Sequence, residues 1–182
     1  MRMMSARELV RIGISAALLC LLSACWLSEK PLLTAQTSSE VDFTGTYRVR
    51  DEQDRSDLVI RSKGEGAYEL HQGKDKVPTR YLRLKDDWYL AQYDGRDEDD
   101  ETGEVVYLYQ PLRVAGRRLY IYSASCDDTP GDFAGMERSS SVCTFTSLEG
   151  LKAVALAYVA RVEKGEVSDE PTVWSRISVS RR

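Results

Sequence analysis

The chain has 182 residues, of which 30% are charged, and its formal net charge is −4 at neutral pH. This length suits one domain of ordinary size with its own core. The mildly acidic balance argues against a nucleic-acid partner and against a general attraction to anionic lipid. The ten tyrosines are typical of strands with a half-buried surface.

The first 24 residues have the pattern of a signal peptide. Arg2, Arg7 and Arg11 precede an uncharged, mostly apolar stretch at 12–24. The stretch is shorter than the roughly 20 apolar residues of a membrane-spanning helix, but it fits the apolar part of a signal peptide, about 7–15 residues. We predict that residues 1–24 are removed, which changes the net charge from −4 to −6 because three arginines and one glutamate leave.

The signal peptide ends in Leu22-Ser23-Ala24-Cys25, a leucine and two small residues before a cysteine. This pattern resembles the lipobox of bacterial lipoproteins. The resemblance implies cleavage before Cys25, a diacylglycerol on its thiol and a membrane as partner; two or more acyl chains anchor stably. Because Trp26 and not aspartate follows, it also implies the periplasmic leaflet of a Gram-negative outer membrane. The alternatives are an uncleaved anchor, or a cleaved signal that leaves a free Cys25 thiol.

Two cysteines remain outside the signal and the lipid site. An even pair in an oxidising compartment most simply forms one disulfide, Cys126–Cys143. It would join the ends of the Pro-, Gly- and Ser-rich loop 127–142 and stabilise the fold by about 3 kcal/mol. The alternative is a redox or metal pair, but the spacing is not Cys-x-x-Cys and His71 is the only histidine. We therefore expect no metal site and no cofactor.

The mature chain divides into a tether and a domain. Residues 25–41 are rich in serine and threonine and are predicted to form a flexible lipidated tether, and residues 42–182 a single β-rich domain. Period-two alternation from Phe43 to Arg50 predicts a half-buried first strand. Pro111 is expected to end the regular pairing of its strand. Further strands are predicted at 58–61, 67–71, 79–84, 88–93, 105–109 and 119–122.

One helix is predicted late in the chain. Thr146 to Glu149 reads as a capping box, apolar residues recur at three- and four-residue steps from Leu148 to Val162, and Gly165 is expected to end the helix. A last strand follows at 172–179. Seven strands, a helix and a closing strand predict a mainly β fold, an antiparallel up-and-down β-barrel with one late α-helix. The alternatives are a β-sandwich or an open curved sheet with a helix.

This order of elements, with Phe43-Thr44-Gly45-Thr46-Tyr47 at its start, resembles lipocalin-like barrels. The sequence departs from that family in one place, because Tyr47 stands where the family has the tryptophan of Gly-x-Trp. The resemblance implies a small apolar or amphipathic ligand in the barrel. The candidate ligand-binding residues are inward aromatic and aliphatic positions: Tyr47, Leu82, Trp88, Tyr107 and Trp174.

Other chemistries have weak support. The acidic run Asp94–Glu104 offers oxygens to calcium but lacks the EF-hand spacing, so a solvated hairpin loop is expected. A lone His71 without a Gly-x-Ser-x-Gly turn argues against nucleophilic catalysis. The sequence therefore predicts a non-enzymatic envelope lipoprotein that binds a ligand. The alternative is a protein-interaction module, an inhibitor or assembly factor, that uses its surface and loop 127–142.

Overall fold

The computed structural model describes residues 26–49, 57–95, 106–129, 131–139, 142–168 and 170–178. The signal peptide, Cys25 and most of the acidic run lie outside these residues. The described elements are β1 (Trp26–Ser28), β2 (Gly45–Val49), β3 (Leu58–Gly64), β4 (Ala67–Gln72), β5 (Asp75–Lys85), β6 (Trp88–Asp94), β7 (Tyr107–Ala115), β8 (Arg118–Ile121), β9 (Met136–Ser139), β10 (Val142–Phe145), α2 (Leu148–Glu163) and β11 (Thr172–Ser178).

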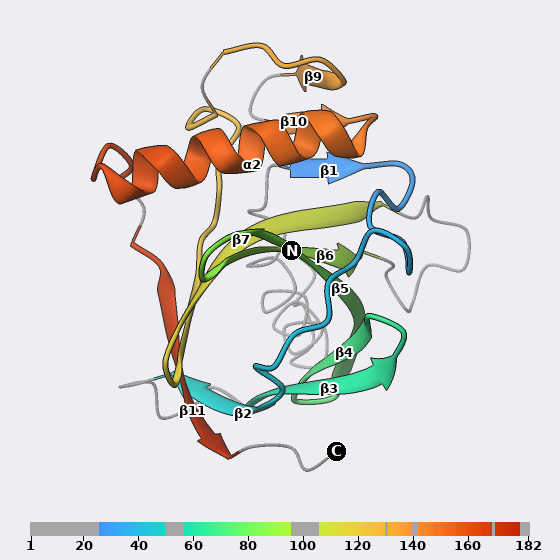
Figure 1. Ribbon diagram of the computed structural model, residues 1–182, viewed down its shortest axis with the longest axis vertical. Helices are drawn as coiled ribbons and strands as arrows, with labels where there is room; N and C mark the ends of the chain where they lie inside the picture. The colour runs from blue at the N-terminus through green and yellow to red at the C-terminus, as the bar shows by residue number, and fades with distance from the viewer. Residues whose placement is uncertain are drawn as a thin grey trace, which may run out of the picture.

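Eight strands close into a barrel (Figure 1). They follow one another in the order β6-β5-β4-β3-β2-β11-β8-β7, and β7 pairs again with β6 to complete the ring. Every pairing in the ring is antiparallel. Each predicted strand corresponds to one strand of the barrel. The predicted barrel with one late helix is therefore confirmed, and the sandwich and open-sheet alternatives are not.

A second, smaller sheet branches from the barrel at β7. Along one edge β7 pairs with β6, but its other edge is shared between β1, at Tyr107 and Leu108, and β8, at 112–115. β1 then pairs in parallel with β10, and β10 with β9. The strand runs through Pro111, contrary to the expected end there. The Pro111 carbonyl accepts from the Tyr122 N–H at 3.0 Å, on the edge of β7 that does not face β6. The N–H that proline lacks would point toward this same edge, where β7 changes partners, and not toward β6.

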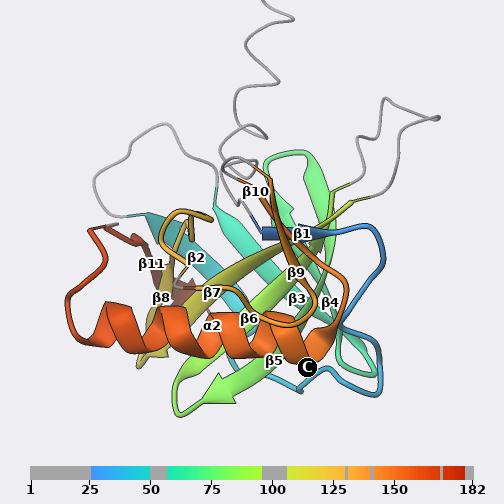
Figure 2. The same ribbon diagram turned by 90° about the horizontal axis from the view of Figure 1, so that it is seen from above.

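Two hydrophobic cores result from this branching. The barrel core fills the ring, and the outer core lies between α2, the small sheet and the outer face of the barrel. Figures 1 and 2 show α2 lying across the barrel wall on the side of β1 and β10. Because β6 and β7 are buried on both faces, their alternate side chains enter different cores. The barrel core includes Ile60, Leu70, Ala91 and Leu112, and the outer core includes Leu90, Tyr109, Leu151, Val154 and Tyr158.

Polar contacts fix both ends of α2. Its N-cap is Ser147, whose hydroxyl accepts from the Gly150 N–H at 3.1 Å, one residue later than the capping box predicted. Gly165, in the left-handed region at φ 70°, follows the last turn as expected. Near that end Glu163 accepts from Trp88 Nε1 at 3.1 Å and from Lys85 Nζ at 2.6 Å. The helix is thereby tied to the hairpin between β5 and β6.

The structure corrects the expected tether. Trp26 and Leu33 are 0% and 1% exposed, and both belong to the outer core. Trp26 packs edge to face against Phe145 and Tyr158, with ring centroids 5.9 and 5.6 Å apart, respectively. The overall Ser/Thr content concealed these buried apolar residues, because a few well-placed large side chains decide packing. None of the helices in the described part of the chain has the length and hydropathy needed to cross a bilayer.

Candidate functional site

The five predicted ligand-binding residues do not meet in one place. Tyr47 and Trp174 lie in the barrel core. Leu82, Trp88 and Tyr107 belong to the outer core, on the opposite face of the barrel wall. The alternation in the sequence identified buried positions correctly, but it could not tell the inner face from the outer one because α2 buries both. The five residues therefore do not define a single ligand pocket.

Aromatic rings occupy the barrel core. The ring of Phe43 packs edge to face against Tyr81 and Tyr89, with centroids 5.0 and 5.1 Å apart, respectively, and Tyr68 meets Tyr81 at 5.2 Å. Burial raises the pKa of Tyr81 well above its usual value, and it also raises the pKa of Tyr93. Such edge-to-face packing stabilises the interior beyond simple burial of area. These described side chains serve the packing of the barrel.

An arginine on β11 lies over the ring of Tyr47. The Arg176 guanidinium lies 5.4 Å from the centroid of the Tyr47 ring, and its Nε donates to the Tyr47 hydroxyl at 2.9 Å. Its Nη2 also donates to the Asp42 carbonyl at 3.1 Å. Burial raises the pKa of Tyr47, and the hydrogen bond from Arg176 partly offsets that rise. A polar hollow of about 290 Å³, which Asp86 and Asp87 also line, lies beside Arg176.

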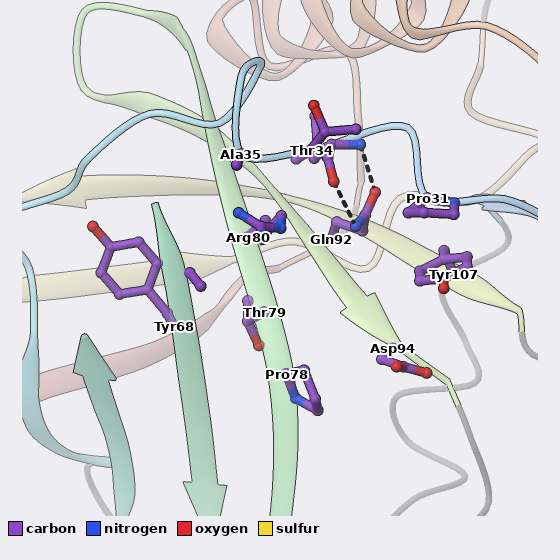
Figure 3. A pocket seen from close by; sticks show the side chains of 12 residues that line it. Pro31, Thr34, Ala35, Tyr68, Pro78, Thr79, Arg80, Gln92, Asp94 and Tyr107 are labelled. Carbon is purple, nitrogen blue, oxygen red and sulfur yellow. Dashed lines mark hydrogen bonds between the residues drawn. The ribbon is translucent and has the colours of Figure 1, made fainter. Parts of the chain in front are cut away.

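A larger groove of about 370 Å³ lies on the outer face of the barrel (Figure 3). Its floor is a cross-strand row in which Ala67 pairs with Arg80, and Arg80 pairs with Gln92. Residues 31–35, which follow β1, form its wall. The lining residues are Pro31, Leu33, Thr34, Ala35, Ala67, Tyr68, Pro78, Thr79, Arg80, Gln92, Asp94 and Tyr107.

Buried hydrogen bonds hold the wall of the groove in position. The Leu33 N–H donates to Gln92 Oε1 at 2.7 Å, and Gln92 Nε2 donates back to the Leu33 carbonyl at 3.2 Å (Figure 3). The Tyr109 hydroxyl donates to the same Oε1 at 3.0 Å, lies 2.7 Å from Ser28 Oγ, and accepts from the Leu32 N–H at 3.2 Å. Burial raises the pKa of Tyr109 to about 12, so this hydroxyl stays protonated at neutral pH.

Charged groups stand at separate places along the groove. Arg80 lies on the floor opposite Gln92, and Asp94 pairs with Tyr107 across β6 and β7. Arg80 is half-buried, and its Nη1 donates to the Glu65 carbonyl at 3.3 Å. A guanidinium carries five N–H donors, so Arg80 can also bind an anionic group in the groove. The groove thus combines apolar walls with one cationic position, Arg80, and one acidic position, Asp94.

The predicted disulfide is present. Cys126 and Cys143 are bonded, and both are buried in the outer core. The loop between them contains β9, a strand that the sequence analysis did not predict. Phe133 and Met136 pack against the outer core, so these apolar side chains of the loop point into the fold. Within the described part of the chain, the large apolar side chain exposed to solvent is Ile177, on β11, at 46%.

The lone histidine has a structural partner. His71 is hydrogen-bonded to Glu69, two residues away on β4, and Lys63 lies 3.5 Å from the same carboxylate. The hydrogen bond to His71 is the main cause that lowers the pKa of Glu69. The predicted lipid site, Cys25, lies outside the described residues.

No family model matches this chain, and the searches of curated proteins and of solved structures also gave no match.

One predicted ligand-binding residue, Tyr107, lines the groove, but the groove itself was not predicted from the sequence. Its wall was assigned to the tether, and neither Arg80 nor Gln92 was among the predicted ligand-binding residues. One signal was available: Trp26, Leu27, Leu32 and Leu33 are large apolar residues on either side of Pro31, in a segment whose other residues are mostly small or polar. A segment packed against the fold, and not a flexible tether, would have accounted for these large apolar residues.

Proposed function

We propose that this chain is a non-enzymatic, lipid-anchored binding module of the cell envelope, with its ligand in the outer groove. The observation that carries the proposal is the set of buried hydrogen bonds from Gln92 and Tyr109 to the arm at 28–33, which holds the wall of the groove in position. A volume of about 370 Å³ lies within the range of small-molecule sites, roughly 300–1,000 Å³. A preformed site of this kind binds without a large ordering cost.

The lining indicates a small amphipathic ligand with an anionic group. Pro31, Ala35 and Pro78 are exposed and offer apolar surface for a short hydrocarbon segment. Arg80 offers charge-assisted hydrogen bonds to a carboxylate or a phosphate. Fatty acids and alkyl phosphates have this chemistry. Membrane attachment through Cys25, which the lipobox resemblance supports, would place the module where such molecules are abundant.

The test is titration of the purified mature protein with dodecanoate, dodecyl phosphate and dodecyltrimethylammonium, followed by calorimetry. We expect the two anions to bind more tightly than the cation. Arg80→Gln should weaken anion binding by about 10-fold or more, since a hydrogen bond to a charged group contributes about 1.5–3 kcal/mol. Arg61→Gln is the matched control, because Arg61 is an exposed arginine on β3 that does not line the groove.

Two results would count against the proposal. Equal affinity of the anions for wild-type protein and for Arg80→Gln would remove Arg80 from the site. Equal binding of the anions and the cation would show hydrophobic adsorption without recognition of charge.

A further inference from the structure

The first residue after the predicted lipid site is a core residue. We infer that the folded domain sits directly against the bilayer, with no spacer between the acylated Cys25 and the barrel. The inference rests on the proposed lipidation, and it adds the face of the domain that meets the membrane. One peptide bond separates Cys25 from Trp26, so their Cα atoms are about 3.8 Å apart.

Trp26 cannot act as a spacer residue because its side chain is fully engaged. It is 0% exposed, its ring meets Phe145 and Tyr158, and its Nε1 donates to Thr129 Oγ1 at 3.0 Å. Its backbone is also paired, opposite Cys143 of β10. Pulling Trp26 out to serve as a linker would expose a large aromatic surface and break a buried hydrogen bond.

The residues that surround Trp26 are also held in place. Cys143, its partner in β10, is bonded to Cys126. The Arg138 guanidinium donates to the Cys126 carbonyl at 2.8 Å and to the Thr129 carbonyl at 2.9 Å. The Thr129 hydroxyl in turn donates to the Ser125 carbonyl at 3.1 Å. The residues around Trp26 are therefore held in place by the disulfide bond and by hydrogen bonds from Arg138 and Thr129.

Direct attachment fixes which side of the domain faces the lipid. A 16-residue flexible tether would span up to about 55 Å and leave the domain free to turn. Without that tether, the face formed by β1, β10 and β9 stays beside the anchor, and β3 lies on the opposite side of the barrel (Figure 1). The exposed side chains Asp127, Glu137 and Arg138 near this anchor are charged, so this face fits lipid headgroups and not the hydrocarbon interior.

The same geometry brings the groove close to the membrane. Its wall begins at Pro31, five residues after Trp26 and therefore at most about 17 Å from it along the chain. An amphipathic molecule in the groove would be within a short distance of the headgroup layer.

The experiment measures energy transfer from the acylated protein to vesicles. The protein is purified from membranes and placed in vesicles of phosphatidylethanolamine and phosphatidylglycerol that carry a headgroup acceptor dye. A fluorescent amino acid replaces either Ser139 or Arg61, both exposed strand positions. Ser139 lies on β9, the second strand from β1 and roughly 10 Å away, whereas Arg61 lies on β3.

We expect clearly stronger transfer from position 139 than from position 61. Twelve Gly and Ser residues inserted between Cys25 and Trp26 should remove most of this difference, because the domain then moves away and turns freely. Equal transfer from the two positions in acylated protein without the insert would overturn the inference while leaving the proposed anchor intact. A chain whose intact mass shows no acylation would remove the anchor and this inference together.

Discussion

At position 26 both the ring and the N–H of a tryptophan find buried partners, although the composition around it suggested a tether. Large buried aromatic side chains replaced by alanine cost about 3–5 kcal/mol. We therefore expect Trp26→Ala to lower the free energy of unfolding of the mature protein by that amount in urea titrations. Trp26→Phe should cost less, because a ring is retained against Phe145 and Tyr158 while the bond to Thr129 is lost. Unchanged stability in Trp26→Ala would show that the arm is free.

The buried tyrosines make stability depend on alkaline pH. Burial raises the pKa of Tyr109 to about 12 from 10.0, and it also raises those of Tyr47, Tyr81 and Tyr93. The folded state holds these protons more tightly than the unfolded state. The contribution of these tyrosines to stability should therefore be constant below pH 10 and fall as the pH rises from 10 toward 12 and beyond.

Urea midpoints across this range, with the ultraviolet absorbance of tyrosinate recorded alongside, provide the measurement. We expect buried tyrosines to ionise together with unfolding. In Tyr109→Phe the fall between pH 10 and 12 should be shallower. A fall that begins well below pH 10 would contradict this account and point to another group.

At the scale of elements, the sequence predicted the strands and the helix whose local periodicity is clear. The eight barrel strands and α2 have clear alternation or three- and four-residue spacing, and each was found. β1, β9 and β10 have three or four residues each and lie in or beside segments whose serine, glycine and proline content indicated a tether or a loop. Pro111 misled the prediction, because a proline is tolerated where its strand changes partners.

The candidate groove could not be predicted for a different reason. Arg80 and Gln92 are twelve residues apart in the sequence and become neighbours only through the register of β5 and β6. The wall at 31–35 is held to Gln92 through side-chain hydrogen bonds that leave no pattern in the sequence. The Cys126–Cys143 pair, in contrast, followed from counting cysteines, since two were left for one bond.

The disulfide has a defined role among the elements, since it ties β10 to the segment that follows β8. Its loop, with a sequence separation of 17, should contribute about 3 kcal/mol. We expect wild-type protein in reductant, and the Cys126→Ala/Cys143→Ala variant without it, to lose similar stability in urea titrations. The variant should not respond to reductant. Alkylation of both thiols in native, unreduced protein would contradict the bond itself.

At the scale of the whole molecule, two cores share one barrel wall. Leu90 of β6 and Tyr109 of β7 face the outer core, while Ala91 and Leu108 of the same strands face the barrel core. The outer elements β1, β9, β10 and α2 join the barrel sheet only where β1 pairs with β7, as far as the described pairings show. The barrel closes without them. The outer layer should therefore be able to open while the barrel stays intact.

Hydrogen exchange followed by mass spectrometry can test this order of opening. In Trp26→Ala we expect faster exchange in α2, β9 and β10, and near-wild-type protection in β3 and β4, because the lost contacts belong to the outer core. Leu70→Ala is the matched change in the barrel core and should accelerate exchange in β3, β4 and β5. If Trp26→Ala instead raised exchange evenly through β3 and β4, the two cores would unfold as one cooperative unit. The arm that forms the groove would then be as stable as the barrel, and the groove could not open without global unfolding.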